Sequence, residues 1–165
     1  MKRIFLILVC VSFSIVLIDQ FSKMYIASAF YLGESITLIP ELFNITHVRN
    51  PGAAFGIFAE SHPTLRSILL LGTPPIAVLL MCIFVFKNKK LTTLEIYAYS
   101  LIVGGALGNL VDRFRLGFVV DFLDFHLSRR FTWPAFNFAD SFIFIGAFIL
   151  IGSSFKKSEE SFSAG

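Results

Sequence analysis

Residues 94–113 read LEIYAYSLIVGGALGNLVDR, an apolar run that closes on Asp112 and Arg113. A helix that crosses a bilayer needs about 20 mostly apolar residues, and this run is long enough. The small residues Gly104 and Gly108 would let a second helix approach closely, as in many membrane bundles. We therefore predict a transmembrane helix here, packed against a neighbour and ending in a polar cluster.

Three other stretches have the same character, and the predicted spans are about 4–22, 67–86, 94–112 and 138–155. The sequence is 56% hydrophobic and only 15% charged, whereas soluble domains carry about a quarter charged residues. The sequence therefore predicts an all-α membrane protein with four transmembrane helices, in a single integral membrane domain over residues 1–165.

The first stretch has an alternative interpretation as a cleavable signal peptide. Residues 2–3 are basic, an apolar run follows, and Ala27-Ser28-Ala29 resembles a cleavage site. However, Asp19 and Lys23 make the part before the small residues long and polar. An uncleaved first span fits this pattern better.

Four spans place both termini on the same side of the membrane. The basic residues divide evenly between the two sides, but those on the side of the termini lie in shorter segments. Positive charge in short loops marks the cytoplasm. We therefore expect both termini in the cytoplasm, and segments of about 31–65 and 113–137 outside it.

Both outer segments contain apolar pieces that are typical of short strands or of a membrane surface. Residues 36–39 and 43–48 show partial alternation and β-branched side chains, which favour strands. Residues 118–123 read FVVDFL, and this apolar content indicates a position on the membrane surface.

Polar residues gather at the outer ends of the predicted helices. Charged groups at membrane depth are costly, so each is a functional candidate. Antiparallel helices bring Asp19, Asn109, Asp112, Asn137 and Asp140 to one face. Two carboxylates held close together cannot both ionise easily. The ionised one can activate water while the protonated one polarises a carbonyl, so that an amide is hydrolysed without a covalent intermediate.

Several of these residues also have a purely structural interpretation. Asp112 followed by Arg113 is compatible with an ion pair at a helix end. Asp19 and Lys23 have the i,i+4 spacing of an ordinary supporting pair. Asp140 near a helix start would be favoured by the helix dipole.

Asp121 is harder to explain structurally, because it lies among apolar residues. An acid in such a stretch should have a raised pKa, which suits a general acid. Asp124 competes with it, because in a helix the i,i+3 spacing would place both on one face. Glu95, near the cytoplasmic start of the third span, is expected at the interface.

Other chemistries are poorly supported. Cys10 and Cys82 lie in apolar runs and no Gly-x-Ser-x-Gly elbow is present. His47, His62 and His126 are scattered without metal-ligand spacing, so we expect neither a metal nor another cofactor. No basic stripe with interleaved aromatics indicates nucleic acid. Two rivals to a peptidase remain: a small transporter or proton channel, since intramembrane acids often mark ion paths, and a non-catalytic membrane scaffold.

Five segments together resemble bacterial lipoprotein signal peptidase, also called signal peptidase II. They are DQFSK at 19–23, RNPGAAFG at 49–56, GGALGNLVDR at 104–113, VVDF at 119–122 and FNFADS at 136–141. Each is short, but together they are specific, stand in the family's order and cover nearly the whole chain.

The resemblance implies a membrane aspartic endopeptidase that removes signal peptides from diacylglyceryl-modified prolipoproteins, cleaving before the lipidated cysteine. It implies four transmembrane helices, a small extracytoplasmic β-cradle, and an active site on the periplasmic side of the bacterial inner membrane. The expected partners are prolipoproteins, membrane lipid and the inhibitor globomycin, and the chain is expected to be a monomer.

The resemblance also assigns residues. Asp121 and Asp140 would be the catalytic pair. The residues expected to bind substrate or support the pocket are Asp19, Lys23, Asn50, Gly52, Asn109, Asp112, Arg113 and Asn137.

Overall fold

A computed structural model describes residues 1–52, 62–128 and 131–163. Four residues of the RNPGAAFG segment, Ala53, Ala54, Phe55 and Gly56, lie outside the described residues, and so does the part of the predicted outer segment around them. Asn50 and Gly52 of the same segment are described.

Four helices are long and apolar enough to cross a membrane, as predicted. They are α1 (Lys2–Ala29), α2 (Pro63–Lys87), α3 (Thr93–Leu116) and α4 (Phe138–Ser163). Each extends beyond its predicted span, because hydropathy measures the lipid-crossing part of a helix and not its polar ends. The extension of α1 matters most, since it keeps Asp19 and Lys23 on one continuous helix.

The limits of α3 are fixed by its capping residues. The Thr92 hydroxyl accepts a hydrogen bond from the Glu95 N–H, and the Glu95 side chain accepts one from the Thr92 N–H, which together form a capping box. At the other end Gly117 adopts φ 79°, a left-handed conformation that glycine tolerates best. Glu95 is therefore a helix-capping residue at the end remote from the sheet.

Helix α3 packs against α1 and α4 through glycines. A Cβ at Gly104 would lie 2.9 Å from the Ser12 carbonyl of α1, and one at Gly105 would overlap the Ala139 carbonyl of α4. The Ser12 hydroxyl also donates to the Ser100 carbonyl at 2.9 Å. Small residues permit such close approach of membrane helices, as the sequence predicted for this stretch.

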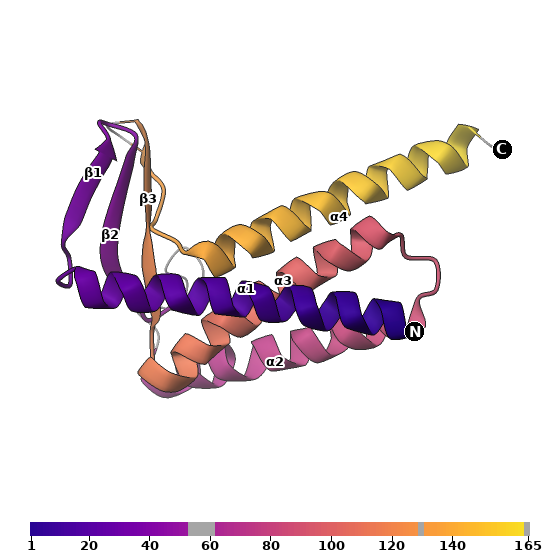
Figure 1. Cartoon of the computed structure of the whole chain (residues 1–165), viewed down its shortest axis with the longest axis horizontal. Helices are drawn as coiled ribbons and strands as arrows, with labels where there is room; N and C mark the ends of the chain where they lie inside the picture. The colour runs from indigo at the N-terminus through magenta and orange to yellow at the C-terminus, as the bar shows by residue number, and fades with distance from the viewer. Residues whose placement is uncertain (53–61, 129–130, 164–165) are drawn as a thin grey trace.

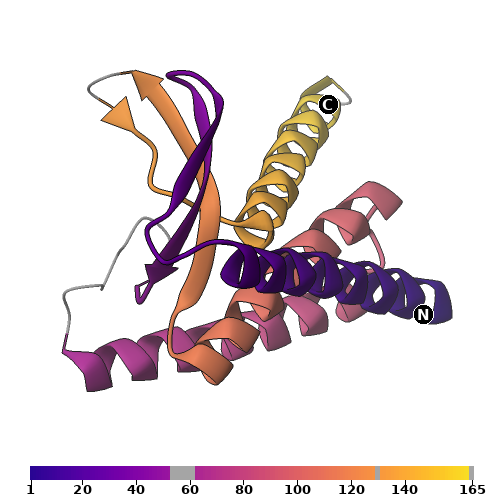
Figure 2. The same ribbon diagram turned by 60° about the vertical axis from the view of Figure 1, so that its left-hand side comes forward.

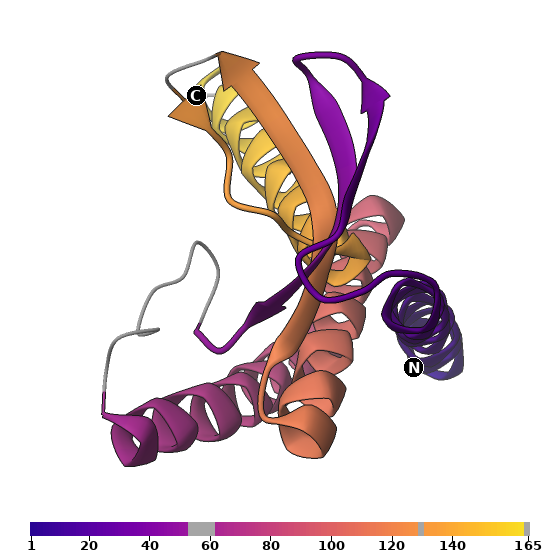
Figure 3. The ribbon, with the colours of Figure 1, turned by 90° about the vertical axis from the view of Figure 1, so that its left-hand side faces the viewer.

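A four-stranded antiparallel sheet crosses one end of the helices. Its strands are β1 (Ser35–Ile39), β2 (Phe43–Asn50), β3 (Val119–Ser128) and β4 (Phe131–Thr132), in the order β1-β2-β3-β4. The amino terminus and the far end of α4 lie away from the sheet (Figure 1). Strand β3 rises from the end of α3 and runs across the helix ends (Figure 3), and the chain then returns from β4 to the start of α4 (Figure 2).

The strand geometry of β3 separates Asp124 from Asp121. Successive residues of a strand point to opposite faces, so Asp124 does not share the face of Asp121, as it would in a helix. Asp124 accepts a hydrogen bond from Asn44 at 3.2 Å. The i,i+3 spacing that would bring the two acids together on a helix therefore does not apply here.

We expect Gly105→Ala to lower the thermal stability of the protein in detergent. The added methyl overlaps the Ala139 carbonyl, and overpacking of this kind costs about 1–3 kcal/mol. Gly72→Ala in α2 is the matched control, because nothing lies within 4 Å of a Cβ there. Equal melting temperatures for the two variants would contradict the close packing of α3 on α4.

Candidate active site

Asp121 is buried on β3, with 2% of its surface exposed. Both of its carboxylate oxygens accept hydrogen bonds from amide side chains. Asn137 Nδ2 donates to Oδ1 at 2.7 Å, and Asn50 Nδ2 donates to Oδ2 at 2.9 Å. Strand β2 and the start of α4 therefore hold this carboxylate from two sides.

Asp140 lies in the first turn of α4, as the sequence suggested. The Asp140 N–H donates to Asn137 Oδ1 at 3.0 Å, and the Asn137 N–H donates to Asp140 Oδ2 at 3.3 Å. This reciprocal arrangement resembles a capping box. Asn109 Nδ2 of α3 donates to Asp140 Oδ1 at 2.8 Å. The helix start thus fixes the position of a part-buried carboxylate without enclosing it fully.

The two carboxylates interact electrostatically, and Asn137 contacts both. Burial raises the pKa of Asp121, the negative charge of Asp140 raises it further, and the donors from Asn50 and Asn137 oppose the change; the resulting pKa is about 7. Like charges at close range cannot both be accommodated. Near neutral pH Asp121 therefore exchanges between its protonated and ionised forms, as an acid–base group does.

Lys23 lies at the centre of a buried ion cluster beside this pair. Its ammonium contacts Asp19 Oδ2 at 2.8 Å and Asp112 Oδ2 at 3.1 Å, and it donates to Asn109 Oδ1 at 2.8 Å. The i,i+4 pair of Asp19 and Lys23 is confirmed. Asp112 was compatible with an ion pair to Arg113, but the ion pair that the described residues show is with Lys23 of α1.

Arg113 turns toward the loop that follows β2. Its Nη2 donates to the Gly52 carbonyl at 3.2 Å, and the Gly52 N–H donates to Asn50 Oδ1 at 2.9 Å. Arg113 Nε is buried, and no described residue accepts a hydrogen bond from it. The guanidinium thus ties this loop to α3 and keeps one donor at the site.

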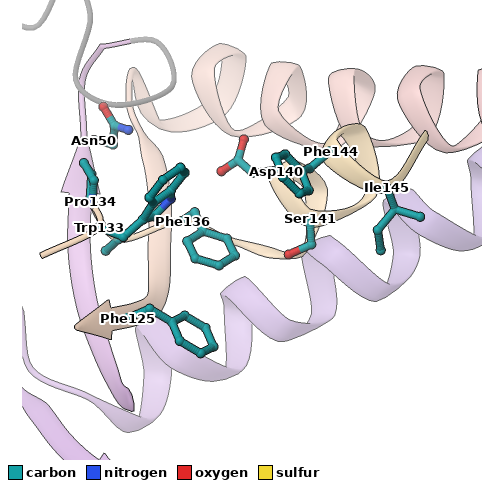
Figure 4. A pocket seen from close by; sticks show the side chains of 10 residues that line it. Asn50, Phe125, Trp133, Pro134, Phe136, Asp140, Ser141, Phe144 and Ile145 are labelled. Atoms are coloured by element: carbon teal, nitrogen blue, oxygen red, sulfur yellow. The ribbon is translucent and has the colours of Figure 1, made fainter. Parts of the chain in front are cut away.

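A cavity of about 460 Å³ opens beside Asp140. Its lining is mostly apolar and aromatic, and consists of Asn50, Phe125, Trp133, Pro134, Ala135, Phe136, Asp140, Ser141, Phe144 and Ile145. In Figure 4 the Asp140 carboxylate points toward Trp133 and Asn50. The structure therefore places the Asp140 carboxylate in the wall of an apolar cavity.

Sequence reasoning did not predict these aromatic lining residues. Phe125 lies four residues after Asp121 on a strand, and Phe144 lies four residues after Asp140 on a helix. Even spacing on a strand and i,i+4 spacing on a helix each define one face. These spacings were present in the sequence, but placing Phe125 beside Asp121 required knowing that residues 119–128 form a strand.

Comparisons with known proteins agree on one family. A family model described as "Signal peptidase (SPase) II" matches residues 11–156. The chain belongs to the signal peptidase II family. The "Lipoprotein signal peptidase" of Syntrophus aciditrophicus is 40% identical over 97% of this chain and 99% of its own length. That of Sulfurihydrogenibium sp. is 46% identical over 86% of each chain.

A solved structure supports the same assignment. It is described as a bacterial membrane enzyme determined by the in meso method at 2.3 Å resolution. It has a TM-score of 0.82 and 32% identity, covering 93% of this chain and 90% of the other. The signal peptidase II resemblance seen in the sequence is therefore confirmed. The protein is a membrane aspartic peptidase, and the channel and scaffold alternatives are set aside.

We expect Asp121→Asn to raise stability at pH 8 but not at pH 4. The folded protein raises the pKa of Asp121 from 3.8 to about 7, so folding favours the protonated carboxyl. The stability that the protonated Asp121 carboxyl contributes is fully present below about pH 4 and is lost as the pH rises through 7. Asparagine does not ionise and avoids a loss on the order of 3 kcal/mol.

The measurement is the apparent melting temperature of both proteins in detergent across this pH range. The difference between variant and wild type should grow with pH. A difference that is the same at pH 4 and pH 8 would contradict the raised pKa.

Proposed function

We propose that this chain is a lipoprotein signal peptidase in which Asp121 and Asp140 are the catalytic pair. It removes signal peptides from diacylglyceryl-modified prolipoproteins, cutting before the lipidated cysteine. The observation that carries this proposal is the link between two carboxylates, on β3 and α4, through the single residue Asn137. The cavity beside Asp140 supplies space for a substrate.

The chemistry requires one ionised and one protonated carboxyl. The ionised carboxylate removes a proton from a water molecule, which attacks the scissile carbonyl. The protonated carboxyl donates to the carbonyl oxygen and stabilises the tetrahedral intermediate. Its collapse releases the amine, which takes up a proton from the pair. A pKa of about 7 at Asp121 supports a shared proton at neutral pH.

The surrounding polar residues support the pair in this proposal. Asn50, Asn109 and Asn137 donate to the carboxylates. Arg113, held against Gly52, offers its buried Nε to a peptide carbonyl of the substrate. The residues Asp19, Lys23 and Asp112 brace the site from α1 and α3.

The apolar cavity suits a substrate that is anchored in lipid. Phe144 and Ile145 line the cavity, and 57% and 46% of their surfaces are exposed. In this proposal the cavity opens between them toward lipid. Acyl chains of the modified cysteine can reach the carboxylates from the membrane without crossing water.

The arrangement of the chain supports the orientation that we propose. The sheet and the start of α4 lie at one end of the molecule, and the amino terminus lies at the other (Figure 1). Asp121 lies on strand β3 of this sheet, and Asp140 lies in the first turn of α4. We place the sheet on the periplasmic face of the inner membrane and both termini in the cytoplasm. Because one chain supplies every residue of the proposed site, a monomer suffices for activity.

We expect Asp121→Asn and Asp140→Asn each to reduce cleavage by at least about 100-fold, since each removes one acid–base group. The assay is release of the signal peptide from a lipid-modified prolipoprotein by purified protein in detergent. Asp124→Asn is the matched control, because Asp124 lies on β3 but bonds to Asn44 and His126. It should retain activity.

Full activity in both Asp121→Asn and Asp140→Asn would exclude the proposed mechanism. Loss of activity in all three variants would indicate damage to β3 and would not support the pair.

We also expect globomycin to change the fluorescence of Trp133, which lines the cavity and is the one tryptophan in the sequence. An inhibitor that fills the cavity removes water from the indole and should shift its emission to shorter wavelength, with saturation. Trp133→Phe should abolish the signal. Full inhibition of cleavage without any spectral change would place globomycin elsewhere.

A further inference from the structure

Lys23 uses every donor of its ammonium group inside the protein. The side chain is 3% exposed. Its contacts are with Asp19, Asp112 and the side-chain oxygen of Asn109, at 2.8, 3.1 and 2.8 Å respectively. A lysine ammonium has three donors and no acceptor. Asn109 is the one contact in this set that leads from the ion cluster to the carboxylate pair.

The hydrogen-bond partners of Asn109 fix the orientation of its side-chain amide. Its oxygen accepts from Lys23 Nζ and from Asn137 Nδ2, at 2.8 and 3.1 Å. Its nitrogen donates to Asp140 Oδ1 at 2.8 Å. The opposite orientation would set an amide nitrogen against an ammonium and an amide oxygen against a carboxylate. A cation on the oxygen of an amide polarises its N–H, which strengthens the hydrogen bond donated at the other end.

Asp121 receives its hydrogen bonds from two amides with other partners. Its donors are Asn137 Nδ2 and Asn50 Nδ2. The oxygen of Asn137 accepts from the Asp140 backbone N–H, and the oxygen of Asn50 accepts from the Gly52 backbone N–H. These backbone donors are neutral, whereas the oxygen of Asn109 accepts from an ammonium. The hydrogen bond that Asp140 receives from Asn109 is therefore the one that a cation strengthens directly.

We propose that Lys23 is a positioning residue that assigns the roles within the pair. Acting through Asn109, it holds Asp140 as the ionised base and leaves the shared proton on Asp121. This inference rests on the proposed function, because it concerns the same two carboxylates. It assigns a different role to each carboxylate. Asp140, which lines the cavity, activates water, and Asp121 donates a proton to the substrate carbonyl.

Through-space electrostatics alone does not separate the two carboxylates. Asp19 and Asp112 are both in contact with Lys23. The positive charge of Lys23 acts on Asp121 and on Asp140, and Arg113 interacts with both as well. The hydrogen bond from Asn109 to Asp140 is the contact that relays the charge of Lys23 to one member of the pair.

The test is the pH dependence of kcat/KM for signal-peptide release, whose acid limb reports protonation of the ionised member. Lys23→Met should move the midpoint of that limb upward by about one pH unit, which lowers kcat/KM on the acid side about tenfold. Lys23→Arg, which keeps a cation, should leave the midpoint closer to wild type. Ser12→Ala, which removes a buried α1–α3 hydrogen bond remote from the pair, should not move it.

A second pair of variants tests the route through Asn109. Asn109→Leu has a similar shape but cannot relay the charge. Lys23→Met should therefore shift the midpoint much less in the Asn109→Leu background than in wild type. An equal shift in both backgrounds, or none in either, would overturn the proposal.

Removing Lys23 leaves the buried carboxylates of Asp19 and Asp112 without a counter-ion, so Lys23→Met can fail to fold. The comparison is then between the double variant Lys23→Met/Asp19→Asn and the single variant Asp19→Asn. In both, the asparagine oxygen can still accept the hydrogen bond that the Ala139 N–H donates to Asp19 at 3.0 Å. Coincident acid limbs in these two proteins would overturn the proposal. If Asp121→Asn and Asp140→Asn retained activity, the proposed function itself would fail, which is a separate outcome.

Discussion

The buried ammonium of Lys23 is the contact on which the outer half of the molecule depends. It lies on α1 between two carboxylates that each bind a further element. Asp19 accepts from the Ala139 N–H at the start of α4, and Asp112 accepts from the Val120 N–H at the start of β3. Three helices and one strand thus meet at one charge. Losing one partner of such a cluster is costly, whereas the intact cluster adds little net stability over apolar packing. Its contribution is therefore to geometry.

The same cluster lies beside two buried acids that interact electrostatically, Asp121 and Asp140. Asp121 and Asp140 are stabilised by amides whose own partners are already fixed by α3, α4 and the loop after β2. Asp121 nevertheless remains unfavourable as an anion, which is why its pKa is near 7. A fold that retains such a group sacrifices stability at that position, which is common where a residue serves function. The surrounding apolar contacts, including Phe122 against Phe138, hold β3 against α4.

The sequence predicted the four helices because lipid imposes a length and a composition on each of them. It predicted that Asp19, Asp112 and Asp140 would converge, because antiparallel spans leave no other arrangement. It could not pair Asp121 with Asp140 from spacing alone. That pairing depends on the register of β3 against β2, in which Asp121 lies opposite Val48, and the family resemblance supplied it. The ion pair of Asp112 with Lys23 was not predicted for the same reason: local spacing does not reveal which element arrives from elsewhere in the chain.

The glycine-rich run of α3 determines how closely its neighbouring helices pack and leaves space for the Asp19 carboxylate. Gly104 and Gly105 admit the backbones of α1 and α4, as small residues do in membrane bundles. At Gly108, however, a Cβ would lie 2.6 Å from the Asp19 carboxylate. The space there is occupied by a charged group and not by a helix backbone. A larger residue at this position would push Asp19 away from Lys23 and release the start of α4, whose first turn carries Asp140. One glycine on α3 therefore controls how closely the ion cluster can approach the carboxylate pair.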